Sequence, residues 1–437
     1  MRRPGQRGAR AVRDDQEVRD HRRAAHRRRR AAHRVAQTET PRHLRPVPRP
    51  VRGAVRGGRD VRRLRNLLTL HRRRPRVAVT PCDAVFRENK WRLLRYRARP
   101  EGLAYRTPIL MVPSLINRHY VLDLAPGKSF VEFLVGRGHD VFIVDWGTPG
   151  PEDRFVTFGD ICGRYVGRAI RQTARIAGVD RIHLLGYCLG GTITTIHIAV
   201  YPEYVATHTA LATPLRFADA GVLAAWTRTR TFDVGAVVEA FGNVPWPLLQ
   251  ASFHMVKPTL GLWKAVQLVD RAWDDEFLDG FVATERWGSD NVSFPGAAYR
   301  EYIEELYRGD ALVEGRYRLD GQPVRLDAIR TPTAVVTFEH DYIVPRACAE
   351  VMLERIRADD VVHIHQNGGH VGAVVSRKAA HGLWPKLAAF WAERDGAARQ
   401  RRAGAGRRAR GAGAAAPGPR PLSPSMNATA SSQSSRS

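Results

Sequence analysis

The stretch that decides the fold is RIHLLGYCLGGT, residues 181–192. Its first half is a short apolar run typical of a buried strand, and GTITTIHIAVY, residues 191–201, is typical of a helix. Gly186 and Gly190 flank Cys188 at two residues on either side, where any side chain would crowd a tight turn. Strand, turn and helix in this order predict a nucleophile elbow in which Cys188 replaces the usual serine. The start of the helix favours negative charge on the sulfur, and the N–H of Leu189 is a candidate oxyanion donor.

Short apolar runs alternate with longer amphipathic runs on both sides of this stretch. This alternation predicts a doubly wound, mostly parallel α/β sheet, and together with the elbow it predicts the α/β-hydrolase fold. The predicted strands are residues 107–112, 141–145, 181–186, 333–338 and 361–365, and the predicted helices are residues 158–177, 190–201, 345–356 and 379–394.

An acid and a base follow the last two predicted strands. Asp341 comes directly after TAVVTF (residues 333–338), and His370 lies in a glycine-flanked loop after VVHIH (residues 361–365). The chain order of Cys188, Asp341 and His370 is the order of nucleophile, acid and base in this fold. The sequence therefore predicts a catalytic triad in which His370 accepts the proton of Cys188 and Asp341 orients the imidazole.

Two members of this triad have an alternative interpretation, and the acid and the base also have rivals nearby in the sequence. Cys188 could be a buried structural thiol, and Asp341 a turn residue or a helix cap before Pro345. Glu339 is a rival acid closer to the strand, and His340 could be merely a turn residue. His363 and His365 alternate within a strand, so we expect them to face packing or solvent.

The loop after the first predicted strand of the sheet is VPSLINR, residues 112–118. The predicted fold builds its second oxyanion donor at this place. We therefore expect a backbone N–H between Ile116 and Arg118, with Ile116 and Asn117 as the first candidates, to complete the oxyanion hole together with Leu189.

The alternation of strand and helix breaks from about residue 214 to residue 330. Five tryptophans are scattered through this stretch, which predicts a cap inserted into the sheet; they either pack its core or form a lid over a lipophilic acyl channel. The expected organisation is an Arg-rich, disordered segment 1–76, a first core part 77–213, the inserted cap 214–330, a last core part 331–395 and a disordered basic tail 396–437.

The charge of the chain is concentrated at its two ends. Residues 1–76 carry a net charge of +20 and residues 396–437 carry +8, so the remaining 319 residues sum to −1. Basic, low-complexity ends predict disorder, and they leave open a granule-binding or nucleic-acid-binding protein that acts through its Arg-rich tails. No aromatic residues interleave these arginines, so we expect no specific nucleic-acid partner.

The four cysteines are widely spaced, and their pattern predicts neither a disulfide framework nor a structural metal site. The sequence contains no apolar run of about 18 residues, which a membrane span would need. No signal-peptide core follows the basic N-terminus. The expected location is therefore the cytoplasm.

Several motifs together resemble the poly(3-hydroxyalkanoate) synthases, and by size the short catalytic subunit of the class III type. The resemblance runs from about residue 80 to residue 394, and the segments at 112–124 and 186–192 are its most specific parts. Its markers are TP (80–81), RENK (87–90), VPSLINRHYVLDL (112–124), DWG (145–147), GYCLGGT (186–192), DYIVP (341–345) and GHVG (369–372).

This resemblance implies an acyltransferase that polymerises 3-hydroxyacyl-CoA on a catalytic Cys188, served by Asp341 and His370, without a cofactor. It also implies attachment to the surface of polyester granules, a homodimer and a second synthase subunit. Tyr342 stands where the family often has histidine, so an auxiliary role of that histidine does not carry over, and the Arg-rich residues 1–76 have no counterpart in the family. A thioesterase or an intracellular polyester depolymerase with the same fold and triad is the alternative.

Overall fold

The computed structural model describes residues 57–395, nearly all of which belong to a compact unit that begins at Arg59. The predicted disordered segments therefore lie outside the described residues, apart from residues 57–76. Eight strands form the main sheet and two form a small hairpin: β1 (Cys82–Glu88), β2 (Trp91–Tyr96), β3 (Ile109–Val112), β4 (Val141–Asp145), β5 (Ile182–Tyr187), β6 (Val205–Leu211), β9 (Thr333–Phe338) and β10 (Val361–Gln366), with β7 (Arg318–Leu319) paired to β8 (Gln322–Pro323).

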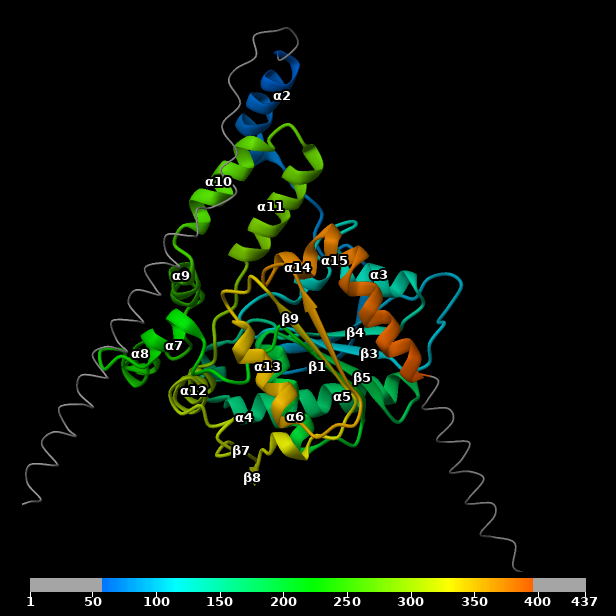
Figure 1. Cartoon of the computed structure of the whole chain (residues 1–437), viewed down its shortest axis with the longest axis vertical. Helices are drawn as coiled ribbons and strands as arrows, with labels where there is room; N and C mark the ends of the chain where they lie inside the picture. Colours follow the sequence, from blue (N-terminus) through cyan, green and yellow to red (C-terminus); the bar gives the residue numbers. More distant parts are fainter. Residues whose placement is uncertain (1–56, 396–437) are drawn as a thin grey trace, which may run out of the picture. The chain divides into compact units, whose positions relative to one another are not determined.

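The main sheet has the strand order β1-β2-β4-β3-β5-β6-β9-β10. Figure 1 shows this sheet among its flanking helices, with β1, β3, β4, β5 and β9 labelled. The six strands from β4 to β10 pair in parallel, and only the β1–β2 and β2–β4 pairs are antiparallel. Every residue of β3, β4, β5 and β9 is buried, because helices cover both faces of the sheet. The prediction of a doubly wound, mostly parallel sheet is confirmed, although β1, β2 and β6 were not predicted.

Helices cover the sheet on both faces. One face packs against α5, α6 and α13, and the opposite face packs against α3 and the helix at residues 383–395. A π-helical turn joins α4 to α5, so the predicted helix 158–177 is continuous, and it ends at Gly178 with a positive φ of 65°. The bounds are η2 (His119–Leu122), α3 (Phe130–Gly136), η3 (Pro151–Phe155), α4 (Phe158–Asp160), η4 (Ile161–Tyr165), α5 (Val166–Ala177), α6 (Leu189–Val200), α13 (Arg346–Arg355), α14 (Gly372–Val375) and α15 (Arg377–His381).

The segment between β6 and β9 is mostly helical, and it occupies the place of the predicted cap. Its tryptophans have divided roles: Trp287 is buried and donates to the backbone oxygen of Arg118 at 2.9 Å, whereas Trp263 is 60% exposed. The elements are α7 (Gly221–Thr227), α8 (Val234–Phe241), α9 (Trp246–Val256), α10 (Leu260–Asp270), α11 (Asp275–Ser289), α12 (Gly296–Glu301), η5 (Tyr302–Arg308) and η6 (Leu326–Ala328).

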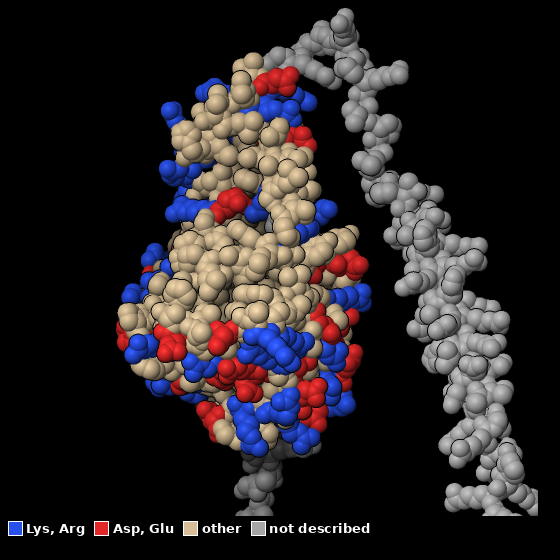
Figure 2. Space-filling view, turned by 90° about the vertical axis from the view of Figure 1, so that its left-hand side faces the viewer, with Lys and Arg blue, Asp and Glu red and all other residues tan. Residues whose placement is uncertain are grey.

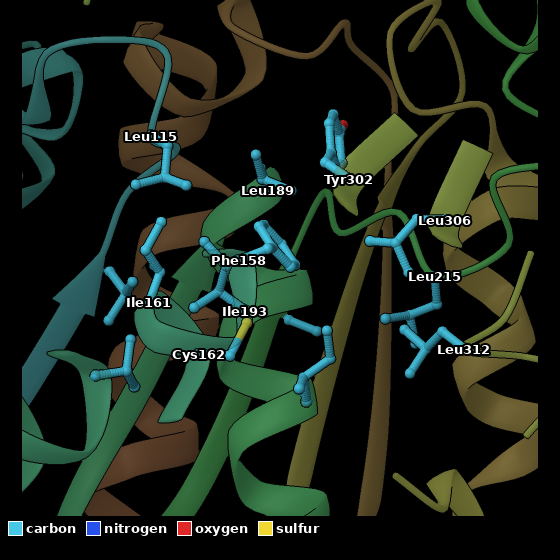
Figure 3. Close-up of a cluster of buried hydrophobic side chains, with 14 of the residues drawn as sticks. Leu115, Phe158, Ile161, Cys162, Leu189, Ile193, Leu215, Tyr302, Leu306 and Leu312 are labelled. Atoms are coloured by element: carbon cyan, nitrogen blue, oxygen red, sulfur yellow. The ribbon is translucent and has the colours of Figure 1, made fainter. Parts of the chain in front are cut away.

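A continuous apolar cluster joins the helix after the elbow to this inserted segment (Figure 3). Leu189 and Ile193 of α6 share it with Phe158 of α4 and with Tyr302 and Leu306 of η5, and the ring centroids of Phe158 and Tyr302 are 5.7 Å apart. Burial of each such side chain contributes about 1.5–3 kcal/mol relative to exposure. The inserted segment is therefore part of the same core as the elbow.

The expectation of disorder for residues 1–76 is wrong for the part that the structure describes. Residues 57–72 form α2 (Gly57–Leu68) and η1 (Leu70–Arg72). Asn66 is buried and donates to the backbone oxygen of Ala272 at 2.8 Å, and Arg73 pairs with Asp279 at 2.6 Å. The arginines that suggested disorder here instead find acidic partners at the start of α11. Within residues 57–395, no helix is both long and apolar enough to cross a membrane.

Candidate active site

Cys188 stands at the sharp turn between β5 and α6. Its φ of 56° and ψ of −127° lie in a region that side-chain-bearing residues rarely adopt. The hydrogen bond from the Cys188 N–H to the Leu211 oxygen of β6, at 2.9 Å, helps to hold this conformation. Strained backbone of this kind concentrates at functional sites, and here it presents a half-buried thiol at the first turn of α6.

The glycines of the elbow are required by close backbone approach. A Cβ added at Gly190 would lie 2.0 Å from the carbonyl oxygen of Val112, and one added at Gly191 would lie 1.8 Å from the Thr213 hydroxyl oxygen. A Cβ at Gly186 would lie 2.4 Å from the Gly191 Cα atom. The elbow therefore fits only without these side chains, because α6 starts directly against the end of β3.

His370 and Asp341 form a buried pair beyond the ends of β10 and β9. The His370 Nδ1 atom lies 2.6 Å from Asp341 Oδ2, and both side chains are at most 8% exposed. The other carboxylate oxygen, Oδ1, accepts hydrogen bonds from the backbone N–H groups of Ile343 at 2.9 Å and Val344 at 2.8 Å. These two bonds fix the carboxylate, so Asp341 can hold one tautomer and one orientation of the imidazole.

The environment of His370 makes its imidazole a strong base. Burial alone would lower its pKa, but the charges of Asp341 and Cys188, together with the hydrogen bond to Asp341, raise the pKa well above its usual value. The influence of Cys188 on this pKa means that the thiol lies near the imidazole. The three predicted residues therefore come together with the geometry of a nucleophile, a base and an orienting carboxylate.

Tyr187 is a functional neighbour that sequence reasoning missed. Its hydroxyl donates to the backbone oxygen of His370 at 3.2 Å, and its ring stacks on the imidazole with centroids 5.4 Å apart. Burial raises the pKa of Tyr187 well above its usual value, so its hydroxyl remains a donor. Its position within the GYCLGG box was the one available signal, but the contact with His370 depends on the fold.

The rival candidates lie elsewhere. Glu339 contacts His365 at 3.0 Å rather than His370, and His363 and His365 both contact the Thr337 hydroxyl at 2.9 Å. The two histidines, with Glu350 of α13, form a separate group that could hold a metal ion. Sequence reasoning placed the two histidines in the strand but did not find this group.

The loop proposed for the second oxyanion donor lies against the elbow and the inserted segment. The Ile116 N–H points to the Ser114 hydroxyl oxygen at 3.4 Å, and the Ile116 carbonyl accepts from Val292 at 2.8 Å. The Asn117 side chain donates to Asn291 Oδ1 at 2.5 Å. Leu189 is the first residue of α6, so its N–H lies directly after the nucleophile. The assignment of Leu189, Ile116 and Asn117 to the oxyanion hole stays a prediction.

A cavity of about 1070 Å³ opens at His370, between α10, α11 and the loops that follow β9 and β10. Its walls combine aromatic side chains with basic ones, and several basic groups are paired, such as Lys264 with Glu285 at 2.6 Å. The Lys257 Nζ atom instead lies 4.1 Å above the ring of Tyr342. This volume suits a large ligand with apolar and anionic parts.

Comparison with known proteins gives two family matches. Residues 74–134 match the model described as the N-terminus of poly-beta-hydroxybutyrate polymerase (PhaC), and residues 109–381 match the alpha/beta hydrolase family. The second match covers more than half of the chain and agrees with the sheet topology.

Three curated relatives are each named poly(3-hydroxyalkanoate) polymerase subunit PhaC. The chain is 35% identical to the Haloferax mediterranei protein over 73% of this chain and 65% of that one. It is 33% identical to the Haloarcula marismortui protein, over 73% and 69%, and 32% identical to the Allochromatium vinosum protein, over 73% and 90%. The chain therefore spans about two thirds of the first two proteins and most of the third. With its Cys188 elbow and its parallel sheet, this chain belongs to the poly(3-hydroxyalkanoate) polymerase family within the α/β hydrolases.

Proposed function

We propose that this protein polymerises 3-hydroxyacyl-CoA thioesters into a polyester and releases CoA, with Cys188 as the covalent carrier of the acyl chain. The observation that carries the proposal is the hydrogen-bonded pair of Asp341 and His370 beside a strained elbow cysteine, in a chain of this family. The thiol, imidazole and carboxylate supply the nucleophile, the base and the orienting group, so this acyl transfer needs no cofactor.

Loading begins when His370 accepts the thiol proton and Cys188 Sγ attacks the thioester carbonyl. Backbone N–H groups, with Leu189 as the first candidate, stabilise the oxyanion of the tetrahedral intermediate. The C–S bond to CoA then breaks, and the CoA sulfur takes the proton back from His370. One thioester replaces another, so the exchange has little thermodynamic cost.

Elongation uses the 3-hydroxyl of the next hydroxyacyl-CoA as the nucleophile. His370 accepts its proton while the hydroxyl oxygen attacks the acyl–Cys188 thioester. An ester bond forms, the C–S bond to Cys188 breaks and the thiol recovers the proton, so the chain, longer by one unit, is left on CoA. Its transfer back to Cys188 repeats the loading step and releases that CoA.

The cavity at His370 supports a CoA thioester as the substrate. Its basic side chains exceed its acidic ones, six to three, and Lys257 and Lys378 lie on the wall that also contains His370. Phosphates are recognised by such ammonium groups, while the aromatic side chains of the wall suit an acyl chain.

The inserted segment supports attachment to a polyester surface. Figure 2 shows a broad face with few charged side chains, on the side that carries α8, α9 and α10 in Figure 1. Exposed apolar side chains in these helices include Phe241 (56%), Met255 (46%), Leu262 (72%) and Trp263 (60%). An uncharged polymer granule in the cytoplasm, a second copy of the chain or a second synthase subunit would each cover such a surface, and we place the protein at the granule.

Incubation with 3-hydroxybutyryl-CoA tests this function. We expect CoA release together with a product of high molecular mass, measured by thiol titration and light scattering. Free 3-hydroxybutyrate in amounts equal to the released CoA would instead identify a thioesterase or depolymerase of the same fold.

A further inference from the structure

A group of histidine and glutamate side chains lies outside the triad, on the face of β9 and β10 that packs against α13. His363 and His365 are two residues apart on the edge strand β10, so both point to the same face, while Ile364 between them enters the core on the other face. Glu350 of α13 reaches the same place from the helix. The triad uses none of these three residues.

The ligand-bearing atoms of this group converge. One nitrogen of His363, one of His365 and a carboxylate oxygen of Glu350 all lie within 4.8 Å of one another. His363 Nε2 is 3.4 Å from Glu350 Oε1, and the Thr337 hydroxyl oxygen lies 2.9 Å from both His363 Nε2 and His365 Nδ1. The three side chains are 24–31% exposed, so an ion can reach them from solvent.

A second carboxylate holds His365 in the form that a metal ligand needs. Glu339 Oε2 lies 3.0 Å from His365 Nε2, so this nitrogen carries the proton and donates a hydrogen bond to the Glu339 carboxylate. The lone pair is then left on Nδ1, which faces the group. Metal-binding histidines commonly have such a carboxylate behind them, because it fixes the tautomer and raises the basicity of the ligand.

We propose that His363 Nε2, His365 Nδ1 and the Glu350 carboxylate bind one Zn²⁺ ion, or a divalent ion of similar preference, at the β9–β10–α13 face. Two imidazoles and a carboxylate are a ligand set typical of zinc, with a water molecule or the Thr337 hydroxyl in the fourth position. Tetrahedral Zn²⁺ with bonds of about 2.1 Å needs ligand atoms about 3.4 Å apart. Small side-chain rotations of these half-exposed residues achieve this contraction.

The ion would connect the segments that carry the acid and the base. Asp341 follows β9 and leads into α13, and His370 follows β10, so ligands from α13 and β10 would clamp the two strands next to the triad. The site is structural in this proposal, and its ligands do not touch substrate.

Arg346 gives the proposal a distinctive consequence. Its Nε atom lies 2.5 Å from Glu350 Oε1, the oxygen that also faces His363. The guanidinium is therefore a cation that competes with the metal ion for this carboxylate. If the group binds a metal ion, replacement of Arg346 by Met should strengthen that binding. If the group is only a network of hydrogen bonds and ion pairs, the same replacement should only weaken the fold.

The test is Zn²⁺ binding by the full chain after treatment with a chelator, measured by competition with a chromophoric chelator and by metal analysis. The Cys188→Ala background is used, because the reactive thiol is itself a zinc ligand. We expect this protein to bind one Zn²⁺ per chain more than the same protein with His363→Asn and His365→Asn. Glu350→Gln should weaken the affinity more than tenfold, and Arg346→Met should raise it several-fold.

The control is His381→Asn, which changes an exposed histidine outside the group and should leave the affinity unaltered. Zn²⁺ should raise the melting temperature of the Cys188→Ala protein but not that of the double histidine variant. Equal zinc binding with and without His363 and His365, or weaker binding after Arg346→Met in a folded protein, would overturn the proposal. Folding is checked by circular dichroism, and Glu350→Gln, which keeps the side-chain shape, serves if the histidine variants unfold.

Discussion

At the scale of single residues, two acids and four histidines cluster after or within the last two strands, and hydrogen bonding separates the roles of the two acids. Asp341 pairs with His370, whereas Glu339 pairs with His365. The sequence predicted Asp341 over Glu339 from its position after β9, because Glu339 lies closer to the strand. It could not predict the group around His363, because that group depends on α13 packing against the face of β10.

Cys188→Ala should abolish CoA release, because no other group of the triad can carry the acyl chain. The melting temperature should change little, since alanine removes only the sulfur of a half-buried side chain. CoA release is followed with 3-hydroxybutyryl-CoA. Cys82→Ala is the matched control, and normal turnover of the Cys188→Ala protein would exclude this thiol as the nucleophile.

Asp341→Asn should lower the pKa of His370, because burial then acts without the charge that opposes it. The folded pKa of His370 is raised, so its pairing stabilises the fold fully below about pH 6.5 and loses this contribution as the pH rises through the raised value. The stability difference between Cys188→Ala and Cys188→Ala/Asp341→Asn should therefore shrink with rising pH. Denaturant unfolding between about pH 6 and 10 measures this difference, and a constant difference would contradict the assignment.

At the scale of secondary structure, the apolar runs predicted five strands of the sheet, but they did not predict β6. Its sequence, VATHTAL, lacks the pattern of a buried strand, because three adjacent residues are polar. In the fold these residues find partners inside the protein: Thr207 contacts His183 at 2.9 Å, and the Nε2 atom of His208 contacts Thr194 at 3.0 Å. Such pairings across elements are invisible in a local pattern. The antiparallel β1 and β2 were missed as well; half-exposed residues and charges run through β1.

Gly190→Ala tests the contact between α6 and β3. The new Cβ would lie 2.0 Å from a backbone oxygen that cannot rotate away, so we expect a loss of about 1–3 kcal/mol in the free energy of unfolding and a loss of activity. Gly261→Ala in α10 is the control, since nothing lies within 4 Å of its added Cβ. Chemical denaturation of both variants measures the difference. Equal stability would show that the elbow is looser than this packing implies.

Lys257→Ala tests the binding of CoA phosphates in the cavity. Loss of one charged hydrogen bond should raise KM for hydroxyacyl-CoA about tenfold with little change in kcat. A thioester of N-acetylcysteamine, which has no phosphates, should be used equally well by both proteins. Lys386→Ala, an exposed lysine outside the cavity, is the control. An equal effect on both substrates would place Lys257 in acyl binding instead.

At the scale of the whole molecule, the division of charge along the chain separated the enzyme body from its basic ends. It put the N-terminal boundary of the body after residue 76, which is too late, because residues 57–76 belong to the described fold. Residues 57–76 were grouped with the Arg-rich end because composition cannot distinguish a solvated arginine from a paired one. In the structure Arg62 and Arg73 share Asp275, and the ring of Trp273 lies 5.4 Å from the guanidinium of Arg59. The start of α11 is thus stabilised by a segment about 200 residues earlier in the chain.

Two truncated proteins test where the enzyme begins. A protein of residues 57–395 should keep polymerisation activity within a few-fold of the full chain, because every motif and the contacts of α2 within the described residues remain. A protein of residues 77–395 should be less stable, since it loses the buried Asn66 hydrogen bond, worth about 1 kcal/mol, and ion pairs worth about 0–1 kcal/mol each. Melting temperature and polymerisation rate are measured for both. High salt screens the ion pairs but not the buried amide, so it should reduce the difference without removing it. Equal stability of the two proteins would show that α2 contributes nothing to the stability of the α11 region despite its contacts. Loss of activity in the 57–395 protein would show that the Arg-rich first 56 residues or the basic tail are part of the enzyme.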